Sequence, residues 1–371
     1  MTHRHGPWPR RAQLAAPALA ALAWLSATTP RDASARAATA LDATAFSDVA
    51  ERAVRSVVNV ATTRRLSPRQ EQMLPPWFRG RGSIDRPASL GSGVIISREG
   101  LVLTNNHVVE QAHGIELTLH DGRKLEARLV GRDPQSDIAV LRIARPPADL
   151  EPMLIADSSK VRLGEIVLAI GSPFGLAQTV TLGIISAKGR ANVGIVDYED
   201  FVQTDASINP GNSGGALVSA TGELLGINTA IASRSGGSQG IGFAIPSNMA
   251  MAILRSLVDK GTVERGWLGV RIQDLDARDA VALGLSDRPG VRIVDLEPGS
   301  PAAVAGLRAG DVVLAVEGTA MTDAARLRVK VAGLQPGSVA RFDVWRGKQA
   351  VAVPVRLGRA PSLAVAGDKE R

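Results

Sequence analysis

Ser213 stands in the middle of a glycine-rich stretch, residues 204–217, whose composition suits nucleophilic chemistry. Gly211 precedes the serine, and Gly214 and Gly215 follow it. Glycine allows sharp backbone turns and lets another chain approach closely. A hydroxyl on such a turn, beside outward-facing backbone N–H groups, supplies what acyl transfer needs: a nucleophile next to a site for the oxyanion. An ordinary turn before the next apolar run explains the same residues, so the interpretation depends on a base and an orienting carboxylate elsewhere.

One histidine and one aspartate are placed to serve that serine. His107 comes shortly after the apolar run 101–103, and Asp137 directly precedes the apolar run 138–141. Either residue alone at the end of a strand is usually structural, as a satisfied polar group or a turn cap. Together with Ser213 they occur in the chain order histidine, aspartate, serine, which is the order of chymotrypsin-like triads. The combination therefore predicts a base, its orienting carboxylate and a nucleophile.

Composition limits the other kinds of chemistry. The 371 residues suggest two or three domains, and 45% hydrophobic with 21% charged residues indicates a globular chain. Lysine plus arginine exceed aspartate plus glutamate by 43 to 36, and this net charge of +7 is scattered, which predicts solubility and no nucleic-acid partner. The absence of cysteine excludes disulfides, thiolate catalysis and zinc–thiolate sites. The five histidines form no zinc-type pair, so we expect no metal and no cofactor.

The first 37 residues have the pattern of a targeting segment. Arginines at positions 4, 10 and 11 precede an uncharged stretch, 12–30, and small-x-small cleavage sites follow at 33–35 and 35–37. The alternative is an uncleaved membrane anchor, since the uncharged stretch is close to the ~20 residues that a spanning helix needs. We expect a cleaved signal peptide, and the anchor stays open.

From residue 91 the chain alternates short apolar runs with glycine or Asx turns. The candidate strands are 94–96, 101–103, 115–119, 125–130, 138–143, 166–170, 183–186, 224–228 and 242–245. Many short strands with frequent turns predict an all-β sandwich or barrel. A helix is expected at 248–260, and 42–60 should form a short helix leading into a strand. Residues 62–88, rich in arginine and proline, are expected to form a long flexible loop.

Five segments together resemble the HtrA/Deg family of serine proteases: 104–109, 136–140, 211–217, 171–175 and 240–246. The first three contain the candidate histidine, aspartate and serine. The resemblance covers about residues 42–358 and implies a mainly β protein. It implies a chymotrypsin-like double six-stranded β-barrel protease domain over 38–262, followed by a PDZ domain over 263–358.

The resemblance also implies roles for individual residues. Ser213 would be the nucleophile, His107 its general base and Asp137 the carboxylate that orients the imidazole. Backbone N–H groups of Gly211 and Ser213, together with Asn212, would form the oxyanion hole. The substrate pocket would be lined by uncharged residues: Ile208, Thr229, Ala230, Ile231 and Ala232. Such a pocket predicts cleavage after small or medium aliphatic residues, although core packing alone also explains Ile208 and Ile231.

After Gly261 a second pattern of strands and short helices begins, and it resembles one PDZ domain, a small β-barrel with two helices. Residues 267–270 resemble the loop whose N–H groups capture a C-terminal carboxylate. A peptide would add as a strand beside 270–272, against a pocket made of Trp267, Leu268, Gly269, Val270, Leu327 and Val331. A PDZ-like brace without a ligand is the alternative. Residues 359–371 are expected to be a disordered tail.

The resemblance implies an exported serine endopeptidase that degrades unfolded or damaged proteins in the periplasm. Its PDZ domain and active-site loops at 190–200 and 233–240 would regulate it. Its partners would be unfolded proteins and C-terminal peptides, and its assembly a homotrimer or a multiple of trimers with contacts near Trp77 and Phe78. Two other functions stay open: a protease anchored in the inner membrane that trims one partner in stress signalling, and a peptide-binding chaperone that no longer cleaves.

Overall fold

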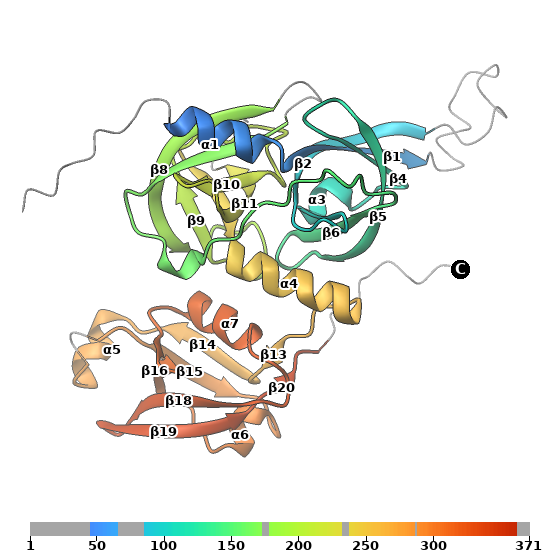
Figure 1. Cartoon of the computed structure of the whole chain (residues 1–371). Helices are drawn as coiled ribbons and strands as arrows, with labels where there is room; N and C mark the ends of the chain where they lie inside the picture. The colour runs from blue at the N-terminus through green and yellow to red at the C-terminus, as the bar shows by residue number, and fades with distance from the viewer. Residues whose placement is uncertain (1–44, 66–84, 173–177, 232–236, 286–287, 362–371) are drawn as a thin grey trace, which may run out of the picture. The chain divides into compact units, whose positions relative to one another are not determined.

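The computed structural model describes residues 45–65, 85–172, 178–231, 237–285 and 288–361, which Figure 1 shows in colour. The expected targeting segment, the aromatic residues Trp77 and Phe78, and Ala232 lie outside the described residues. The described residues belong to one unit, Ala43–Arg371. None of the described helices combines the length and hydropathy that crossing a membrane requires.

Six antiparallel strands close a first barrel in the order β1-β2-β3-β6-β5-β4. They are β1 (Val57–Arg65), β2 (Asp85–Ile95), β3 (Leu101–Thr104), β4 (Gly114–Thr118), β5 (Lys124–Asp133) and β6 (Ile138–Ile143). Pairing of β1 with β4 closes the barrel, with Val60 opposite Leu117. Side chains of a strand point alternately to its two faces, so one set fills the interior, where Val58, Ile95 and Leu117 are fully buried.

A second barrel has the strand order β10-β11-β12-β9-β8-β7. Its strands are β7 (Ile166–Gly171), β8 (Thr179–Arg190), β9 (Phe201–Thr204), β10 (Ala216–Ser219), β11 (Leu224–Ile231) and β12 (Gly242–Pro246). Val167, Ile185 and Leu217 are fully buried inside it. The two barrels confirm the predicted double six-stranded β-barrel. Strand β8 is longer than the run 183–186 suggested, because most of its side chains are exposed and an apolar pattern marks only part of it.

Two helices border these barrels, α1 (Ala45–Val54) and α4 (Ser247–Lys260). Helix α4 contacts β5 and β6 of the first barrel and β11 and β12 of the second. Its Ile253 and Leu257 belong to one apolar cluster with Leu103 and Ile170, one from each barrel. Gly261 ends the helix in a left-handed conformation (φ 72°), and its N–H donates to the Leu257 carbonyl. This shared cluster fixes the two barrels against each other.

Strands β1 and β2 extend into both ends of the segment expected to be a loop. Arg64 pairs with Arg86, and Arg65 pairs with Asp85. The expectation of a loop over all of 62–88 was therefore wrong at 62–65 and 85–88, and residues 66–84 lie outside the described part. Ladder hydrogen bonds are made by the backbone, so strands can continue where charged residues and a proline hide the apolar pattern.

A third group of strands forms the sheet β14-β15-β16-β18-β19, with β17 paired to β16. The strands are β14 (Val270–Asp274), β15 (Val291–Leu296), β16 (Val312–Val316), β17 (Thr319–Ala320), β18 (Val339–Arg346) and β19 (Gln349–Arg356). Helices α5 (Ala277–Ala282), α6 (Pro301–Val304) and α7 (Ala324–Ala332) accompany them. Ile293, Val313 and Phe342 are fully buried in the core of this domain.

The ends of this domain differ in detail from the sequence-based expectation. Ser300 caps α6 and Pro301 is its first residue. Helix α5 was not expected, although the Asp276 side chain caps it by accepting from the Asp279 N–H. Strand β20 (Gly358–Arg359) pairs with β13 (Gly266–Trp267), so Arg359 belongs to a strand and the expected tail cannot begin there. Residues 362–371 lie outside the described part.

Candidate active site

His107 and Asp137 form a close pair at the end of the first barrel. His107 lies on the short helix α3 (Asn106–Val109), just after β3, and Asp137 immediately precedes β6. His107 Nδ1 lies 2.8 Å from Asp137 Oδ2, and the His107 backbone N–H donates to Asp137 Oδ1 at 3.0 Å. The carboxylate is buried, while the imidazole is 48% exposed. The aspartate therefore fixes the imidazole from its buried side and leaves the opposite side open.

Asp137 has an unusual backbone conformation that several neighbours hold. Its φ is 55°, in the left-handed region that non-glycine residues rarely adopt. The Asn105 side chain and the Asn106 N–H both donate to its carbonyl oxygen, at 2.9 and 3.2 Å. The Thr229 hydroxyl donates to Asp137 Oδ2 at 2.6 Å. Strained backbone conformations persist where the surroundings over-determine them, and they often occur at functional sites.

Ser213 lies on the glycine-rich turn before β10. A Cβ on Gly214 would lie 2.1 Å from the Ser92 carbonyl oxygen, and one on Gly215 would lie 2.2 Å from that of Ile170. Gly214 is therefore required by the close approach of the first barrel, and Gly215 by the close approach of β7 within the second barrel. Ser213 Oγ donates to the Thr229 carbonyl oxygen at 3.1 Å. Among the residues that the structure describes, no hydrogen bond joins Ser213 to His107.

Thr229 thus bonds to two of the three candidate residues, Asp137 and Ser213, whereas the family resemblance implied a place in the substrate pocket. Its hydroxyl reaches the aspartate and its carbonyl reaches the serine. Ser92 is a further contributor that the sequence did not indicate. Its hydroxyl donates to the Gly211 carbonyl oxygen at 2.6 Å and accepts from the Ser172 N–H at 2.8 Å. No local motif marks either role, because both depend on contacts between segments that are remote in sequence.

The backbone N–H groups expected to form the oxyanion hole differ in whether they already donate a hydrogen bond. Gly211 has φ 99°, and the N–H groups of Gly211 and Ser213 have no hydrogen-bond partner among the described residues. The Asn212 N–H donates to the Asn209 carbonyl oxygen at 2.9 Å, and Asn212 is almost fully buried. The structure therefore leaves two of the three N–H groups of this turn free for an incoming oxygen.

The expected pocket residues are only partly at a surface. Ile208 is 2% exposed and packs in the core of the second barrel. Ala230 and Ile231 are half-buried at the end of β11. A Cβ on Gly242 would lie 2.8 Å from Ile208 Cδ1, so β12 backs directly onto this side chain. Core packing accounts for Ile208 as well as a pocket does.

The loop at 190–200 is held by its own acidic residue. The carboxylate of Glu199 accepts hydrogen bonds from three backbone N–H groups, those of Val193, Ile195 and Val196. The Tyr198 N–H donates to the Gln135 carbonyl oxygen at 3.1 Å, which ties the loop to the segment before Asp137. Burial raises the pKa of Tyr198 and that of Asp200. The second expected regulatory loop, 233–240, lies largely outside the described residues.

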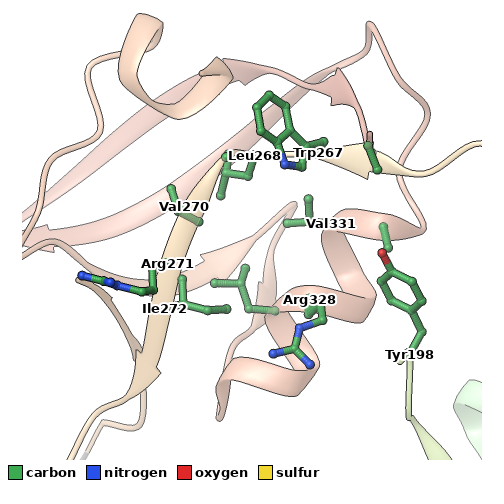
Figure 2. Close-up of a pocket in the computed structure, with 13 residues that line it drawn as sticks. Tyr198, Trp267, Leu268, Val270, Arg271, Ile272, Arg328 and Val331 are labelled. Atoms are coloured by element: carbon green, nitrogen blue, oxygen red, sulfur yellow. The ribbon is translucent and has the colours of Figure 1, made fainter. Parts of the chain in front are cut away.

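A separate cavity of about 300 Å³ lies along β14 and α7 of the second domain (Figure 2). All six residues predicted for peptide binding line it: Trp267, Leu268, Gly269, Val270, Leu327 and Val331. Arg271 and Ile272, from the segment expected beside the peptide, also line it, together with Arg328 and Tyr198, which the sequence did not indicate. Figure 2 shows side chains of β14 and α7 pointing toward one another across this space.

The edge of β14 has the character of a strand-addition site. Within the described residues, β14 pairs with β15 alone and stands at the end of its sheet. Gly269, just before it, has φ 71°, and a Cβ there would lie 2.3 Å from the Ser300 Cβ. The exposed side chain of Arg328 places positive charge at a groove that is otherwise mostly apolar, whereas the charge of Arg271 is paired with Asp295 at 3.5 Å. An extended peptide with a terminal carboxylate suits such an edge.

Comparison with known proteins identifies two kinds of domain in this chain. A trypsin-like peptidase domain model matches residues 91–227, and a PDZ domain model matches 266–357. The periplasmic pH-dependent serine endoprotease DegQ of Escherichia coli is 44% identical over 326 residues, which cover 86% of this chain and 71% of DegQ.

Two further relatives extend the comparison. A probable periplasmic serine endoprotease, DegP-like, of Brucella suis is 46% identical over 278 residues, 75% of this chain, and the chain spans about half (54%) of its length. The solved structure of the HtrA-type protease AlgW with a decapeptide is 44% identical, with a TM-score of 0.69, over 85% of this chain and 99% of that one. The chain therefore belongs to the HtrA-type family of serine proteases, with a trypsin-like peptidase domain followed by a PDZ domain.

Proposed function

We propose that this chain is an exported serine endopeptidase that hydrolyses peptide bonds in unfolded or damaged proteins of the cell envelope. One observation carries the proposal: Thr229 bonds to both Asp137 and Ser213, and Asp137 bonds to His107. Thr229 thus bonds to the nucleophile and to the orienting carboxylate, which in turn bonds to the base, and these residues come from remote segments. The naming of the DegQ and DegP-like relatives as periplasmic serine endoproteases supports the same activity and compartment.

In the proposed mechanism Ser213 Oγ attacks the scissile carbonyl carbon. Rotation of the serine side chain releases Oγ from the Thr229 carbonyl and turns it to His107 Nε2, which takes the proton. Asp137 keeps the other imidazole proton on Nδ1 and stabilises the imidazolium. His107 then protonates the leaving amine, and a water molecule hydrolyses the acyl-enzyme by the same route in reverse.

The negative charge on the tetrahedral oxygen needs donors, and two are proposed here. The N–H groups of Gly211 and Ser213 would receive it, each contributing about 3 kcal/mol to transition-state stabilisation. Asn212, expected as a third member, would have to release the Asn209 carbonyl oxygen first. A reorientation of this turn, influenced by the loops at 190–200 and 233–240, would then regulate activity.

Substrate selection is proposed to follow from the uncharged residues beside the serine. Thr229, Ala230, Ile231, Ala232 and Ile208 would favour small or medium aliphatic side chains before the scissile bond. No acidic side chain belongs to this group, so substrates with lysine or arginine at that position should be cleaved slowly.

The PDZ groove is proposed to bind C-terminal peptides and to regulate cleavage. The open edge of β14, the apolar side chains of Leu268, Val270 and Val331, and the charge of Arg328 support this role.

We also propose a homotrimer or a multiple of trimers. Fractionation with N-terminal sequencing of the mature protein separates a cleaved signal peptide from an inner-membrane anchor that would favour a signalling role.

The direct test is digestion of casein by the mature protein and by Ser213→Ala, with and without a peptide that has an aliphatic C-terminus. We expect cleavage by the parent and none by the variant. Equal cleavage by both proteins would refute the assignment of Ser213. If neither cleaves and both bind the peptide, the chain is a peptide-binding chaperone.

A further inference from the structure

We propose that Arg265 is a positioning residue for Asp137, acting through the turn 133–137. Arg265 lies in the linker between α4 and β13, outside the segments that the two family models match. Its side chain nevertheless reaches the turn that presents the catalytic carboxylate. The inference rests on the proposed protease function for two of its three readouts, peptide hydrolysis and Ser213 labelling, and is independent of it for the third, the NMR signal of His107.

The guanidinium of Arg265 contacts two residues of that turn. Nη2 donates to Asp133 Oδ2 at 2.5 Å and to Ser136 Oγ at 3.0 Å. Asp133 is the first residue of the turn, and Ser136 directly precedes Asp137. The arginine side chain is 8% exposed and that of Asp133 only 4%, so the pair is shielded from solvent. Both bonds come from the same nitrogen, and the planar guanidinium fixes the directions of its N–H groups, whereas the ammonium of a lysine rotates on a flexible stem.

A third contact comes from the loop at 190–200. The Arg265 guanidinium carbon lies 4.4 Å from the ring centroid of Tyr198, within the range of a cation–π interaction. The backbone N–H of the same tyrosine donates to the Gln135 carbonyl oxygen in the middle of the turn. Gln135 in turn donates from its side chain to Asp197 at 3.2 Å. Arg265 and residues 197–198 therefore bind the same turn, 133–137.

The turn needs such support because its own hydrogen bonds are long. The Ser136 N–H to Asp133 carbonyl distance and the Asp137 N–H to Pro134 carbonyl distance are both 3.4 Å. Good backbone bonds are about 2.9–3.0 Å long. The turn must also end with Asp137 at φ 55°, a conformation that costs energy for a side chain other than glycine. External contacts therefore determine the shape of this turn more than internal ones do.

The backbone of Arg265 is itself held in place by a hydrogen bond. The Arg265 carbonyl oxygen accepts from the Ala360 N–H at 2.9 Å, next to the pairing of β13 with β20. A carboxylate that orients an imidazole acts only within a narrow range of positions, because small misplacements of reacting groups cost large factors in rate. Arg265 thus sets the position of Asp137 without touching the substrate.

The test uses the full mature chain with paired substitutions. Arg265→Met alone would leave the Asp133 charge buried and unpaired, which endangers folding. Arg265→Met combined with Asp133→Asn removes both charges and is the main variant. Arg265→Lys keeps the positive charge but lacks the planar guanidinium. Arg162→Met, which breaks an exposed pair with Glu165, is the matched control.

Three readouts are measured: kcat and KM on an aliphatic chromogenic peptide, the rate of Ser213 labelling by a fluorophosphonate, and the low-field proton NMR signal of His107 Nδ1–H. For the double variant we expect a melting temperature within a few degrees of the parent and a kcat at least tenfold lower. Its KM should stay within twofold of the parent's. Labelling of Ser213 should slow at least tenfold, as kcat does, and the NMR signal should broaden or disappear. Arg265→Lys should fall between, and Arg162→Met should match the parent.

A double variant with the parent's kcat and NMR signal would overturn the proposal. One that unfolds at the assay temperature would show a purely structural role and overturn it too. If the parent cleaves nothing while the NMR signal still responds to Arg265, the protease function fails and the positioning role stands.

Discussion

The surroundings of Asp137 consist of hydrogen-bond donors, whereas the groove along β14 consists of apolar side chains and an open strand edge. Both oxygens of the Asp137 carboxylate accept hydrogen bonds, and the donors come from residues 107 and 229. The groove instead offers apolar side chains and a strand edge that pairs on one side only among the described residues. A reacting group must be held in one orientation, whereas a peptide strand brings its own hydrogen-bonding groups.

The comparison teaches where single substitutions should act sharply. At the bonded site, removal of one partner leaves other buried polar groups unsatisfied, and effects should be large. At the groove, each apolar or charged contact adds a small independent share, and effects should be graded. Each of the four substitutions below tests one side of this contrast.

The largest effect is expected from Asp137→Asn. An asparagine preserves the shape but favours the wrong imidazole tautomer, so kcat should fall about 10⁴-fold. Steady-state hydrolysis of an aliphatic chromogenic peptide measures this loss. Calorimetry with a C-terminal peptide is the control, because the dissociation constant at the groove should not change. A coupled change in that constant would break the separation between the two regions.

The second expected effect concerns stability. In Gly214→Ala the new methyl group would meet the Ser92 carbonyl oxygen at 2.1 Å, at a φ of 84°. We expect a loss of about 3 kcal/mol or more in the free energy of unfolding. Gly318→Ala is the matched control, since its φ is 71° but no described atom lies within 4 Å. The control should lose only about 1 kcal/mol, and urea unfolding compares the two. Similar losses would show that the close approach at the serine turn is unimportant.

The third prediction separates the two roles considered for Thr229. Thr229→Val removes the hydroxyl that donates to Asp137 and keeps the side-chain shape. Hydrogen bonds to charged groups contribute about 1.5–3 kcal/mol, so kcat should fall roughly 10- to 100-fold. Thr229→Ser should recover most of the activity. A change in KM or in side-chain preference with unchanged kcat would instead support the pocket role.

The smallest effect is expected at the groove. Arg328→Gln removes one exposed positive charge from α7, and exposed charge contacts are worth about 0.2–1 kcal/mol. Binding of a C-terminal peptide should weaken by about two- to fivefold. The difference should shrink at high salt in titration calorimetry. Labelling of Ser213 by a fluorophosphonate should be unaffected. A tenfold or greater loss would mean that the charge, not the apolar lining, dominates recognition.

Much of the architecture could be predicted from the sequence, part of it from local patterns and part from the family resemblance. Short apolar runs separated by glycine turns predicted an all-β sandwich or barrel, whereas the resemblance implied the double barrel and the six residues near 267 and 327 that line the groove. His107, Asp137 and Ser213 could be chosen because each lies in a distinctive segment and acyl transfer requires those residue types. The ends of strands β1 and β2 could not be predicted, since backbone pairing continues where the side-chain pattern stops.

The types of the reactive side chains and their order along the chain follow from the amino-acid sequence alone. How these side chains are held depends on the packing of remote segments. Thr229 changed from a pocket residue to a link between Asp137 and Ser213, and Arg265 bonds to Asp133 and Ser136 across 132 and 129 residues of chain. The physical reason is distance along the chain: periodicity and motifs report on neighbours a few residues away. Contacts between remote segments form only when the barrels and the linker pack.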